Sequence, residues 1–340
     1  MFDLEIVGQL DILSLAIWGS RVSIPLVGSS TELAAIERRL DAIARAERTT
    51  LISGPTGSGK DVIARSLHER SRRSAAPLIV VHCAALPDNL IEAELFGHAK
   101  GAFTGAYQAR SGLVRSAEHG SLFLDEIDSL SLAAQAKLLR FLETGEFRAV
   151  GADHAERSDA WVIAATNQEL RARVRDRTFR EDLLYRLEAL TVRVPALRER
   201  RDEIEPLAAL FLRNAISRWG APPRTLSESV LQALVAYAWP GNVRQLRNAI
   251  ERAVAVCTSD LIELDDLPEH LSEAARNEVL PFVAPLGPSA ASLPDQVRAF
   301  EMARIRAALV HASGNRSQAA RLLGLPRRTL GSKLREYNLE

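Results

Sequence analysis

The chain has 340 residues and carries 43 Lys and Arg against 43 Asp and Glu, so its formal net charge is zero. Hydrophobic residues make up 47% and charged residues 25%, which excludes a disordered or collagen-like chain and is typical of a folded protein of about two domains. Aromatic residues make up only 5%, which argues against stacking on single-stranded nucleic acid as the main function.

We expect a short N-terminal arm over residues 1–24, too few for a receiver or ligand-sensing domain. Its first residues are acidic where a signal peptide needs positive charge, and Asp11 and Arg21 interrupt the following apolar stretch too early for a membrane span. Cys83 and Cys257 are too few for a disulfide framework and have no zinc-ligand spacing. These features predict a cytoplasmic protein without membrane contact.

Five short apolar or β-branched runs alternate with helical patterns, at 49–53, 78–82, 121–125, 161–166 and 190–194. This alternation predicts an α/β domain with a parallel sheet, which we place at residues 25–200. Over 201–272 strand signals vanish, and helical periodicity indicates a separate helical subdomain. Residues 280–294 contain four prolines and a glycine, so we expect a linker within 273–294, followed by a last domain over 295–340.

A phosphate-binding loop follows the first predicted strand. It fits the pattern G-x-x-x-x-G-K and consists of Gly54, Pro55, Thr56, Gly57, Ser58, Gly59, Lys60 and Asp61. Its glycines let backbone N–H groups converge on phosphate oxygens, the following helix N-terminus adds a favourable dipole, and Lys60 can reach the terminal phosphates. Asp61 departs from the Ser or Thr that usually contacts magnesium. The alternative is a glycine-rich turn without a ligand, and the strand–loop–Lys–helix context argues against it.

Polar side chains also follow two later strands. Asp125 and Glu126 end the third strand, at the edge where parallel sheets bind ligands, so that Asp125 could hold Mg²⁺ and Glu126 could act as general base on the attacking water. Asn167 follows the fourth strand, where its amide either orients that water and senses the γ-phosphate or is a solvated turn residue. Arg180 and Arg186 form either a charged helix face or a pair that stabilises phosphoryl transfer across a subunit interface.

Between these motifs, six residues read GAFTGA: Gly101, Ala102, Phe103, Thr104, Gly105 and Ala106. Small residues around one Phe and one Thr fit neither a helix nor a strand, and indicate a mobile loop tip that presents an aromatic side chain to a partner. The motif closely resembles the signature of the AAA+ activators of sigma-54 RNA polymerase, the bacterial enhancer-binding proteins. The resemblance runs from about residue 27 to the C-terminus.

The resemblance implies a fold and a set of partners. The fold is an AAA+ P-loop parallel sheet with a helical lid subdomain and an all-α C-terminal helix-turn-helix domain. The implied cofactors are ATP and Mg²⁺, and the chain would assemble with itself, from a dimer to a hexameric ring. The GAFTGA loop would engage sigma-54, with Phe103 and Thr104 making the decisive contacts.

The resemblance also implies roles for the nucleotide motifs. Residues 54–61 match the Walker A loop, which in this family typically has an acid after the lysine. Asp125 and Glu126 match Walker B, and Asn167 matches sensor I. Arg180 and Arg186 match the arginine fingers that act on the neighbouring subunit's nucleotide. Arg244, in Trp-Pro-Gly-Asn-Val-Arg, matches sensor II.

One position departs from the family pattern. The second strand of these activators commonly ends in Asn-Cys-Ala, where the Asn is thought to hold the Walker B glutamate, whereas this chain has His82-Cys-Ala. A histidine can still hydrogen-bond a carboxylate, more strongly when protonated. We hypothesise that His82 restrains Glu126 and makes turnover more sensitive to pH than an Asn would. The alternative is a histidine merely buried at a strand end.

The C-terminal segment is basic. Residues 295–340 carry nine Lys and Arg against four Asp and Glu, a balance of +5, so the rest of the chain holds −5. An amphipathic helix over 295–312, a short helix over 314–325 and a basic helix over 326–337 predict a helix-turn-helix whose second helix enters the major groove. This unit resembles the Fis-type domain of the same activators, the alternative being a three-helix unit that binds no DNA. The candidate DNA contacts are Arg316, Ser317, Arg327, Arg328, Thr329, Ser332 and Lys333.

These observations predict a sigma-54-dependent activator that binds upstream double-stranded DNA, hydrolyses ATP as a ring and remodels the sigma-54 RNA polymerase holoenzyme through the GAFTGA loop. By resemblance it belongs with activators that lack an attached regulatory domain, so a regulatory protein in trans or the abundance of the chain would control it. One alternative is a DNA-binding repressor or scaffold whose AAA+ fold only binds nucleotide. Another is a general unfoldase, which would need a substrate-threading loop in place of GAFTGA.

Overall fold

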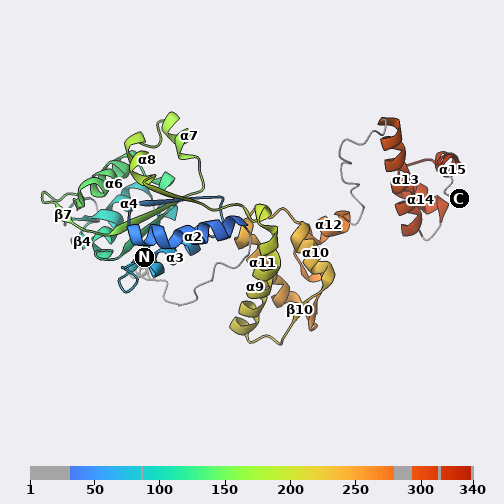
Figure 1. Ribbon diagram of the computed structural model, residues 1–340, viewed down its shortest axis with the longest axis horizontal. Helices are drawn as coiled ribbons and strands as arrows, with labels where there is room; N and C mark the ends of the chain where they lie inside the picture. The colour runs from blue at the N-terminus through green and yellow to red at the C-terminus, as the bar shows by residue number, and fades with distance from the viewer. Residues whose placement is uncertain (1–30, 86, 104, 279–292, 313–314, 338–340) are drawn as a thin grey trace, which may run out of the picture. The chain divides into compact units, whose positions relative to one another are not determined.

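The computed structural model describes residues 31–85, 87–103, 105–278, 293–312 and 315–337 (Figure 1). The chain divides into two compact units, Met1–Pro268 and Glu269–Glu340. The predicted arm 1–24, Thr104 and most of the predicted linker lie outside the described residues. Within the described ranges, every helix is too short or too polar to cross a lipid bilayer.

A parallel sheet of five strands forms the centre of the first unit, in the order β2-β5-β8-β1-β9. The strands lie within a residue of the predicted runs: β1 (Thr50–Ser53), β2 (Leu78–His82), β5 (Ser121–Asp125), β8 (Trp161–Thr166) and β9 (Leu190–Arg193). All six residues of β8 are buried, as expected for a central strand covered on both faces. The predicted α/β class and its parallel sheet are confirmed.

Helices cover both faces of the sheet. Along β5, Leu122 and Leu124 face one apolar cluster and Phe123 the other, because successive side chains of a strand alternate between faces. The cluster that contains Phe123 is completed by α2 (Thr31–Ala46) and α3 (Lys60–Arg70). The other contains residues of five helices, α4 (Asp88–Phe96), α5 (Leu113–Ser116), α6 (Leu132–Thr144), α7 (Leu170–Arg175) and α8 (Glu181–Leu187). Two short 3₁₀ turns, Cys83–Ala85 and Ile127–Ser129, follow β2 and β5.

Two small antiparallel pairs extend from this domain. Strand β3 (Gly97–His98) pairs with β4 (Arg110–Ser111), and β6 (Glu146–Phe147) pairs with β7 (Glu156–Arg157). The first pair encloses the GAFTGA segment. Neither pair was predicted, because two-residue strands carry no hydrophobic period.

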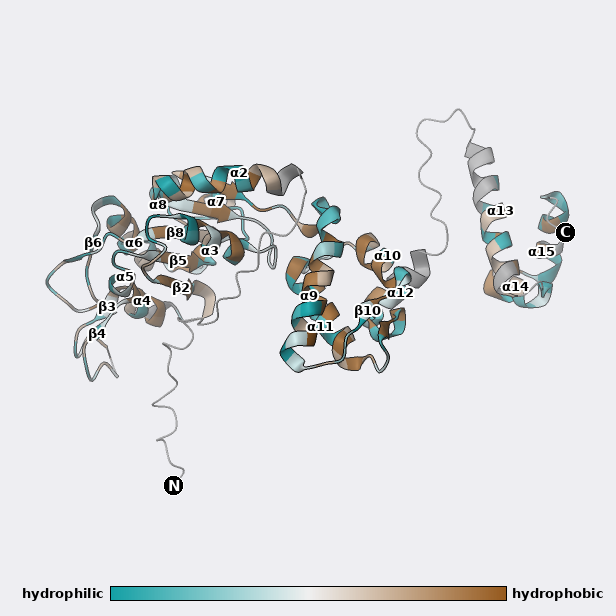
Figure 2. Ribbon diagram, turned by 60° about the horizontal axis from the view of Figure 1, so that its bottom comes forward, coloured by the Kyte–Doolittle hydropathy of each residue, from teal (hydrophilic) through white to brown (hydrophobic). Residues whose placement is uncertain are grey.

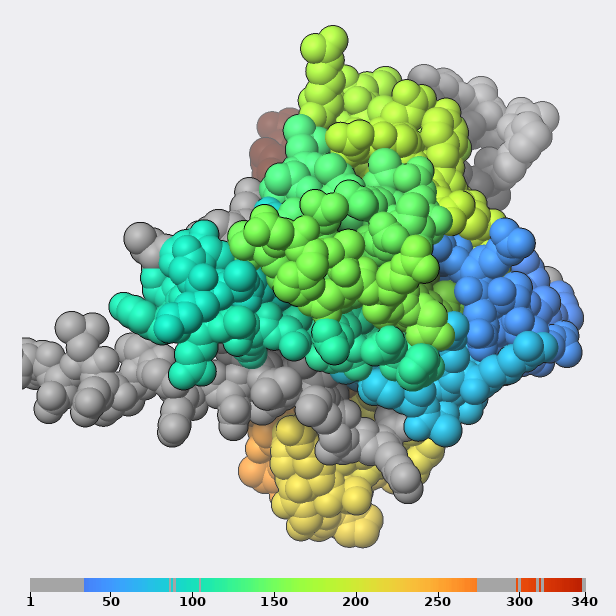
Figure 3. Space-filling model, turned by 90° about the vertical axis from the view of Figure 1, so that its left-hand side faces the viewer, coloured from blue at the N-terminus to red at the C-terminus, as the bar shows by residue number. Residues whose placement is uncertain are grey.

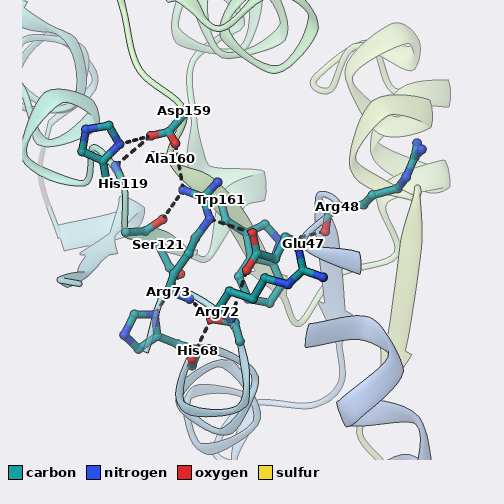
Figure 4. Close-up of polar contacts among 12 residues, drawn as sticks. Glu47, Arg48, His68, Arg72, Arg73, His119, Ser121, Asp159, Ala160 and Trp161 are labelled. Atoms are coloured by element: carbon teal, nitrogen blue, oxygen red, sulfur yellow. Dashed lines mark hydrogen bonds and ion pairs between the residues drawn. The ribbon is translucent and has the colours of Figure 1, made fainter. Parts of the chain in front are cut away.

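A polar network ties together the end of the sheet opposite the phosphate-binding loop (Figure 4). The Arg73 guanidinium lies 3.0 Å from a Glu47 carboxylate oxygen, and the His119 N–H donates to Asp159 at 2.7 Å. The Trp161 indole N–H donates to the Arg48 carbonyl at 2.8 Å. These contacts join the loops that precede β1, β2, β5 and β8.

The rest of the first unit is mainly helical, as predicted. It contains α9 (Ile204–Trp219), α10 (Glu228–Ala236) and α11 (Asn242–Val256), with 3₁₀ turns at Leu197–Glu199, Arg201–Glu203 and Leu264–Asp266. Helices α9 and α11 show both hydrophobic and hydrophilic turns (Figure 2), and their apolar residues, among them Phe211 and Ile250, are buried. The prediction of a strand-free segment is wrong in one detail, because β10 (Thr225–Leu226) pairs in parallel with β11 (Leu261–Ile262).

The second unit contains α12 (Glu269–Glu278), α13 (Leu293–His311), α14 (Arg316–Leu322) and α15 (Arg327–Glu336). Residues 273–278, at the start of the predicted linker, are helical, and α13 begins at Leu293, two residues before the predicted last domain. The last three helices share a small core that includes Ile305, Ala319 and Leu330. The Asn315 side chain caps α14 and Pro326 occupies the N-cap of α15, so both helices begin within two residues of their predicted starts.

Candidate nucleotide site and the surfaces around it

The phosphate-binding loop joins β1 to the N-terminus of α3, as predicted. The Lys60 ammonium group lies under the loop and donates to the carbonyls of Gly54 at 2.9 Å and Pro55 at 3.2 Å. Burial lowers the pKa of Lys60, although Asp125 and Glu126 nearby act in the opposite direction. The Lys60 ammonium group is therefore close enough to Asp125 and Glu126 for their charges to influence its pKa.

The loop leaves no room for a side chain at Gly57. Gly57 has a φ of +72°, and a Cβ there would lie 2.5 Å from the Gly241 carbonyl oxygen. The Arg244 N–H donates to the Gly57 carbonyl at 3.3 Å, so the lid helix α11 begins directly against the loop. The glycine is thus required both for the turn and for the approach of the lid.

Asp125 and Glu126 lie where β5 ends, at the same edge as the loop. Burial raises the pKa of Asp125, but a hydrogen bond from His82 and the charge of Lys60 outweigh it, so the pKa lies below its usual value. Asp125 is therefore ionised at neutral pH. Glu126 has a φ of 56° and a ψ of 48°, a left-handed backbone conformation that costs energy for a residue with a side chain and that clusters at functional sites.

His82 contacts Asp125 rather than Glu126, which corrects the expected partner. Its Nδ1 lies 3.3 Å from a carboxylate oxygen of Asp125, and this hydrogen bond raises the pKa of His82. The register of the sheet explains the pairing, because β2 and β5 run in parallel with His82 directly beside Asp125. His82 is half exposed, so it is not the buried histidine of the alternative interpretation.

Asn167 contacts the phosphate-binding loop. Its amide nitrogen donates to the Thr56 hydroxyl at 2.7 Å. Thr166, the residue before it, donates its hydroxyl to Asp128 at 2.6 Å, two residues beyond Glu126. The ends of β1, β5 and β8 are thus connected through side chains.

The sequence analysis overlooked Asn242, which lies two residues before Arg244. Its side chain is buried, donates to the Thr56 carbonyl at 2.9 Å and accepts from the Leu197 N–H at 2.8 Å. Its φ of 51° is left-handed, which Asn tolerates better than most residues. The signal was present in the Pro-Gly-Asn turn, but only the structure shows that this turn contacts the loop.

A buried ion pair, which the sequence analysis also overlooked, contacts the backbone of the phosphate-binding loop. The Arg200 guanidinium lies 2.9 Å from Glu203 and donates to the Ser58 carbonyl at 2.6 Å. The two side chains are 5% and 0% exposed. Ser58 and Arg200 are far apart in the sequence, so no local pattern predicts the contact.

Replacing Arg200 by Met is expected to lower the free energy of unfolding of the first unit by about 3–5 kcal/mol, because it removes the ion partner of a carboxylate without exposed surface. Urea denaturation followed by far-UV circular dichroism measures the loss. The exposed neighbour Arg201, replaced by Met, is the matched control and should leave the midpoint unchanged. Equal midpoints for the two variants would show that the buried pair does not stabilise the fold.

A cleft of about 520 Å³ opens beside the loop. The first residues of the loop form one wall, the segment after β9 a second and the Trp239–Pro240 turn a third. Trp239 is 1% exposed and donates its indole N–H to the Leu234 carbonyl at 2.7 Å, which fixes this third wall.

Arg180 and Arg186 lie on the surface at α8. The Arg180 guanidinium pairs with Asp182 at 2.7 Å, and the Arg186 guanidinium donates to the Leu142 carbonyl at 2.7 and 3.0 Å. The charged groups that shift the pKa of Lys60 are Asp125, Glu126, Arg244 and Asp61. Of the predicted residues, Arg244 is therefore brought to the loop, whereas Arg180 and Arg186 contact other groups of their own chain.

The GAFTGA segment is a loop, as predicted, and its described residues are Gly101–Phe103, Gly105 and Ala106. The Gly101 N–H donates to the Ala106 carbonyl at 2.8 Å, which closes its base. Phe103 is 36% exposed and its ring lies 5.0 Å from that of His98. In Figure 3 the teal surface around residue 100 projects at the left of the domain. The loop thus presents a half-shielded aromatic ring.

The C-terminal candidates differ in accessibility. Arg327, Arg328 and Ser332 are exposed on α15, and Thr329 is partly buried. Arg316 and Ser317 lie at the start of α14, Arg316 being exposed. The Lys333 ammonium instead binds Glu301 of α13 at 2.5 Å, an interaction that raises the pKa of Lys333, and Glu301 also accepts from the Tyr337 hydroxyl. Lys333 is therefore engaged within the domain.

Comparison with known proteins shows which families the chain is similar to. Three family profiles match it: the sigma-54 interaction domain over residues 26–193, an AAA+ ATPase lid domain over 198–280, and the bacterial regulatory protein, Fis family, over 296–337. The chain is 43% identical over 298 residues to the regulatory protein AtoC of Escherichia coli, covering 88% of this chain and 64% of that protein.

Further relatives give the same result. The alginate biosynthesis transcriptional regulatory protein AlgB of Pseudomonas aeruginosa is 40% identical over 314 residues, covering 92% of this chain and 68% of that protein. The crystal structure of NtrX from Brucella abortus in complex with ATP superposes with a TM-score of 0.67 at 30% identity, covering 92% of this chain and 69% of that one. The chain thus spans roughly two thirds of the length of these relatives.

Proposed function

Because the chain belongs to the family of AAA+ activators of sigma-54 RNA polymerase, with an ATPase module, a lid and a Fis-type DNA-binding domain, we propose that it works as a ring that converts ATP hydrolysis into promoter opening. The observation that carries the proposal is the convergence of Lys60, Asp125 and Glu126 at one sheet edge. The GAFTGA loop belongs to the same domain.

ATP binds with its phosphates in the loop and its base in the adjoining cleft. Ser58 supports this placement, since its hydroxyl is buried without a hydrogen-bond partner among the described residues. Asp125 fits Mg²⁺, because it is ionised and the ion favours one or two carboxylates together with phosphate oxygens. The described residues contain no group of three ligand side chains that would hold a metal without the nucleotide. Magnesium would neutralise charge that develops on the phosphates.

Residues of two neighbouring subunits contribute to ATP hydrolysis. Glu126 accepts the proton of the attacking water, and Asn167, fixed on Thr56, orients the water and senses the γ-phosphate. Lys60 and Arg244 contact the phosphates from the loop and the lid. Arg180, at the N-cap of α8, and Arg186, within α8, are both exposed; they reach the nucleotide of the neighbouring subunit and stabilise the charge of the transition state.

The GAFTGA loop transmits movement driven by ATP hydrolysis to sigma-54. Phe103 is accessible on the projecting loop and Thr104 adjoins it, so both can contact the polymerase. The Ala99 N–H, just before the loop, donates to the Val150 carbonyl at 2.9 Å, so the base of the loop contacts the segment between β6 and β7. A change in that segment on hydrolysis would be passed to the loop through this contact.

The C-terminal domain holds the ring at upstream DNA through α15. Replacing Arg327 and Arg328 together by Ala should lower affinity for duplex DNA at least about tenfold and reduce the slope of log K against log salt by about 2, because two phosphate contacts are lost. Fluorescence anisotropy over a range of salt concentrations measures both quantities. Arg306→Ala, at an exposed arginine of α13, is the control for the loss of one positive charge from the same domain outside α15. An unchanged salt slope would contradict the assignment of α15 as the DNA-contacting helix.

A repressor or scaffold that only binds nucleotide is the second candidate, favoured by the DNA-binding domain alone. The two functions differ in their need for Glu126. A Glu126→Gln chain should lose promoter activation if hydrolysis drives the function, and should retain full regulation if nucleotide binding suffices.

A further inference from the structure

Gln135 of α6 has no exposed surface, yet it carries a polar side chain in the middle of an apolar helix face. Its amide nitrogen donates to the Leu130 carbonyl at 2.7 Å and to the Thr178 carbonyl at 3.1 Å. Its amide oxygen accepts the backbone N–H of Arg180 at 2.9 Å. Both amide hydrogens and the oxygen are thus used, and of side chains this long only Gln offers two donors and an acceptor on one group.

These three bonds join two functional segments. Leu130 follows the 3₁₀ turn Ile127–Ser129, which begins directly after Glu126. Thr178 and Arg180 flank Phe179, which is 2% exposed and belongs to the same apolar core. Gln135 therefore fixes the backbone that carries Arg180 to the backbone that follows the Walker B acids.

A second connection reaches the same turn. The Arg173 carbonyl accepts the N–H groups of Thr178 and Phe179 at 3.0 and 3.2 Å. The Arg173 guanidinium lies 3.4 Å from Asp128. The turn before α8 is thus attached at two points, and both attachments lead back to the segment after Glu126.

The Arg180 side chain itself is exposed, and its guanidinium pairs with Asp182, two residues along the same chain. A long side chain on the surface reaches a fixed point in a neighbouring molecule only if its backbone is fixed. Because removing a buried amide also leaves two carbonyls and an N–H unpaired, its bonds are costly to break.

We propose that Gln135 is a positioning residue, which fixes the backbone of Arg180 relative to the Walker B segment so that Arg180 is presented correctly to the nucleotide of the neighbouring subunit. This inference rests on the proposed role of Arg180 across the subunit interface. Its consequence is that a change at Gln135 impairs the site of the neighbour more than the site of its own subunit.

The test uses Gln135→Met, which keeps the length of the side chain and leaves no cavity but removes all three bonds. Its kcat for ATP should fall about 10²-fold at an unchanged KM, since a displacement of about 1 Å in a catalytic group has an effect of this size. Ser121→Ala is the matched control, because it removes a buried hydrogen bond, to His68 at 2.9 Å, at the other end of the sheet. The control should keep the wild-type kcat, and a Gln135→Met chain with wild-type kcat would overturn the proposal.

Mixed rings separate positioning in trans from damage within the subunit. Lys60→Ala chains cannot use ATP but carry an intact Gln135 and Arg180. Mixing them with Gln135→Met chains should raise turnover about tenfold above that of either sample alone, because each Gln135→Met site next to a Lys60→Ala chain then receives a correctly placed arginine. Absence of this rise would place the defect within the subunit and overturn the proposal.

A parallel mixture of Lys60→Ala with Arg180→Ala tests the premise separately. If this mixture is not rescued, the role of Arg180 in trans is wrong; if it is rescued and the Gln135→Met mixture is not, only the role of Gln135 is wrong. Should Gln135→Met fail to fold, as judged by its thermal transition, Gln135→Asn replaces it. This variant keeps a neutral amide but is one methylene shorter, so it cannot make all three hydrogen bonds at once, and it should show the same rescue.

Discussion

Replacing Glu126 by Gln should lower ATP turnover about 10²–10⁴-fold while ATP binding is retained, because the change removes a general base without altering the size of the side chain. Glu126 lies close enough to Lys60 to influence the pKa of the ammonium group, and its backbone is held in a left-handed conformation beside Asp125. The amide cannot accept a proton from water, whereas the loop, Lys60 and the cleft that bind the nucleotide remain.

Phosphate release under saturating ATP measures this turnover, and equilibrium binding of a fluorescent ATP analogue measures affinity. Glu118→Gln is the matched control, because Glu118 is an exposed acid that precedes β5, at the other end of the strand. Turnover of Glu126→Gln within about tenfold of the wild type would contradict the assignment of Glu126 as general base.

Replacing Phe103 by Ala should abolish open-complex formation with sigma-54 polymerase while ATP turnover stays close to that of the wild type. The ring of Phe103 contacts His98, and the bonds that close the loop run between its own residues, Gly101 and Ala106. Truncation therefore removes a contact surface without reaching the phosphate-binding loop. Thr104→Ala, at the neighbouring position, should separate the two activities in the same way.

Tyr107 provides a matched control for the loop. It is 83% exposed and follows the motif directly, so Tyr107→Ala removes an aromatic side chain from the same region outside the six residues. Heparin-resistant open complexes should form normally with this variant. Full promoter opening by Phe103→Ala, or equal loss of ATP turnover and opening, would show that the loop does not transmit the energy of hydrolysis in the proposed way.

The sequence predicted those features that local patterns encode. Strands β5 and β8 are continuous apolar runs, and the residues that end them, Asp125 and Thr166, lie at one edge because parallel strands share a direction. Lys60 lies at the same edge, because the loop that carries it follows β1, which belongs to the same parallel sheet. Motif spacing alone therefore predicted the edge of the sheet at which the nucleotide motifs meet.

The features missed are contacts between segments that no local pattern connects. Asn242 and Arg200 contact the phosphate-binding loop although they lie far from it in the sequence. Gln135 hydrogen-bonds three backbone groups that belong to two other segments. The partner of His82 was wrong because the choice between Asp125 and Glu126 depends on sheet register, which the hydrophobic pattern of two short strands does not set.

The pairing of β10 with β11 and the start of the linker were missed for a related reason. Strands of two residues are too short to show a hydrophobic period. Helix α12 continues to Glu278 because no proline interrupts it, and the next proline after the helix is Pro281. Composition identified the proline-rich segment but did not determine the helix end before it.

The central claim, that ATP hydrolysis by this chain opens promoters, is tested most directly by one measurement. Heparin-resistant open complexes of sigma-54 holoenzyme on a sigma-54 promoter are counted with the full-length chain and either ATP or a non-hydrolysable analogue. We predict open complexes with ATP and none with the analogue, nor with polymerase that lacks sigma-54. Equal opening with ATP and with the analogue would contradict the claim, because nucleotide binding alone would then suffice.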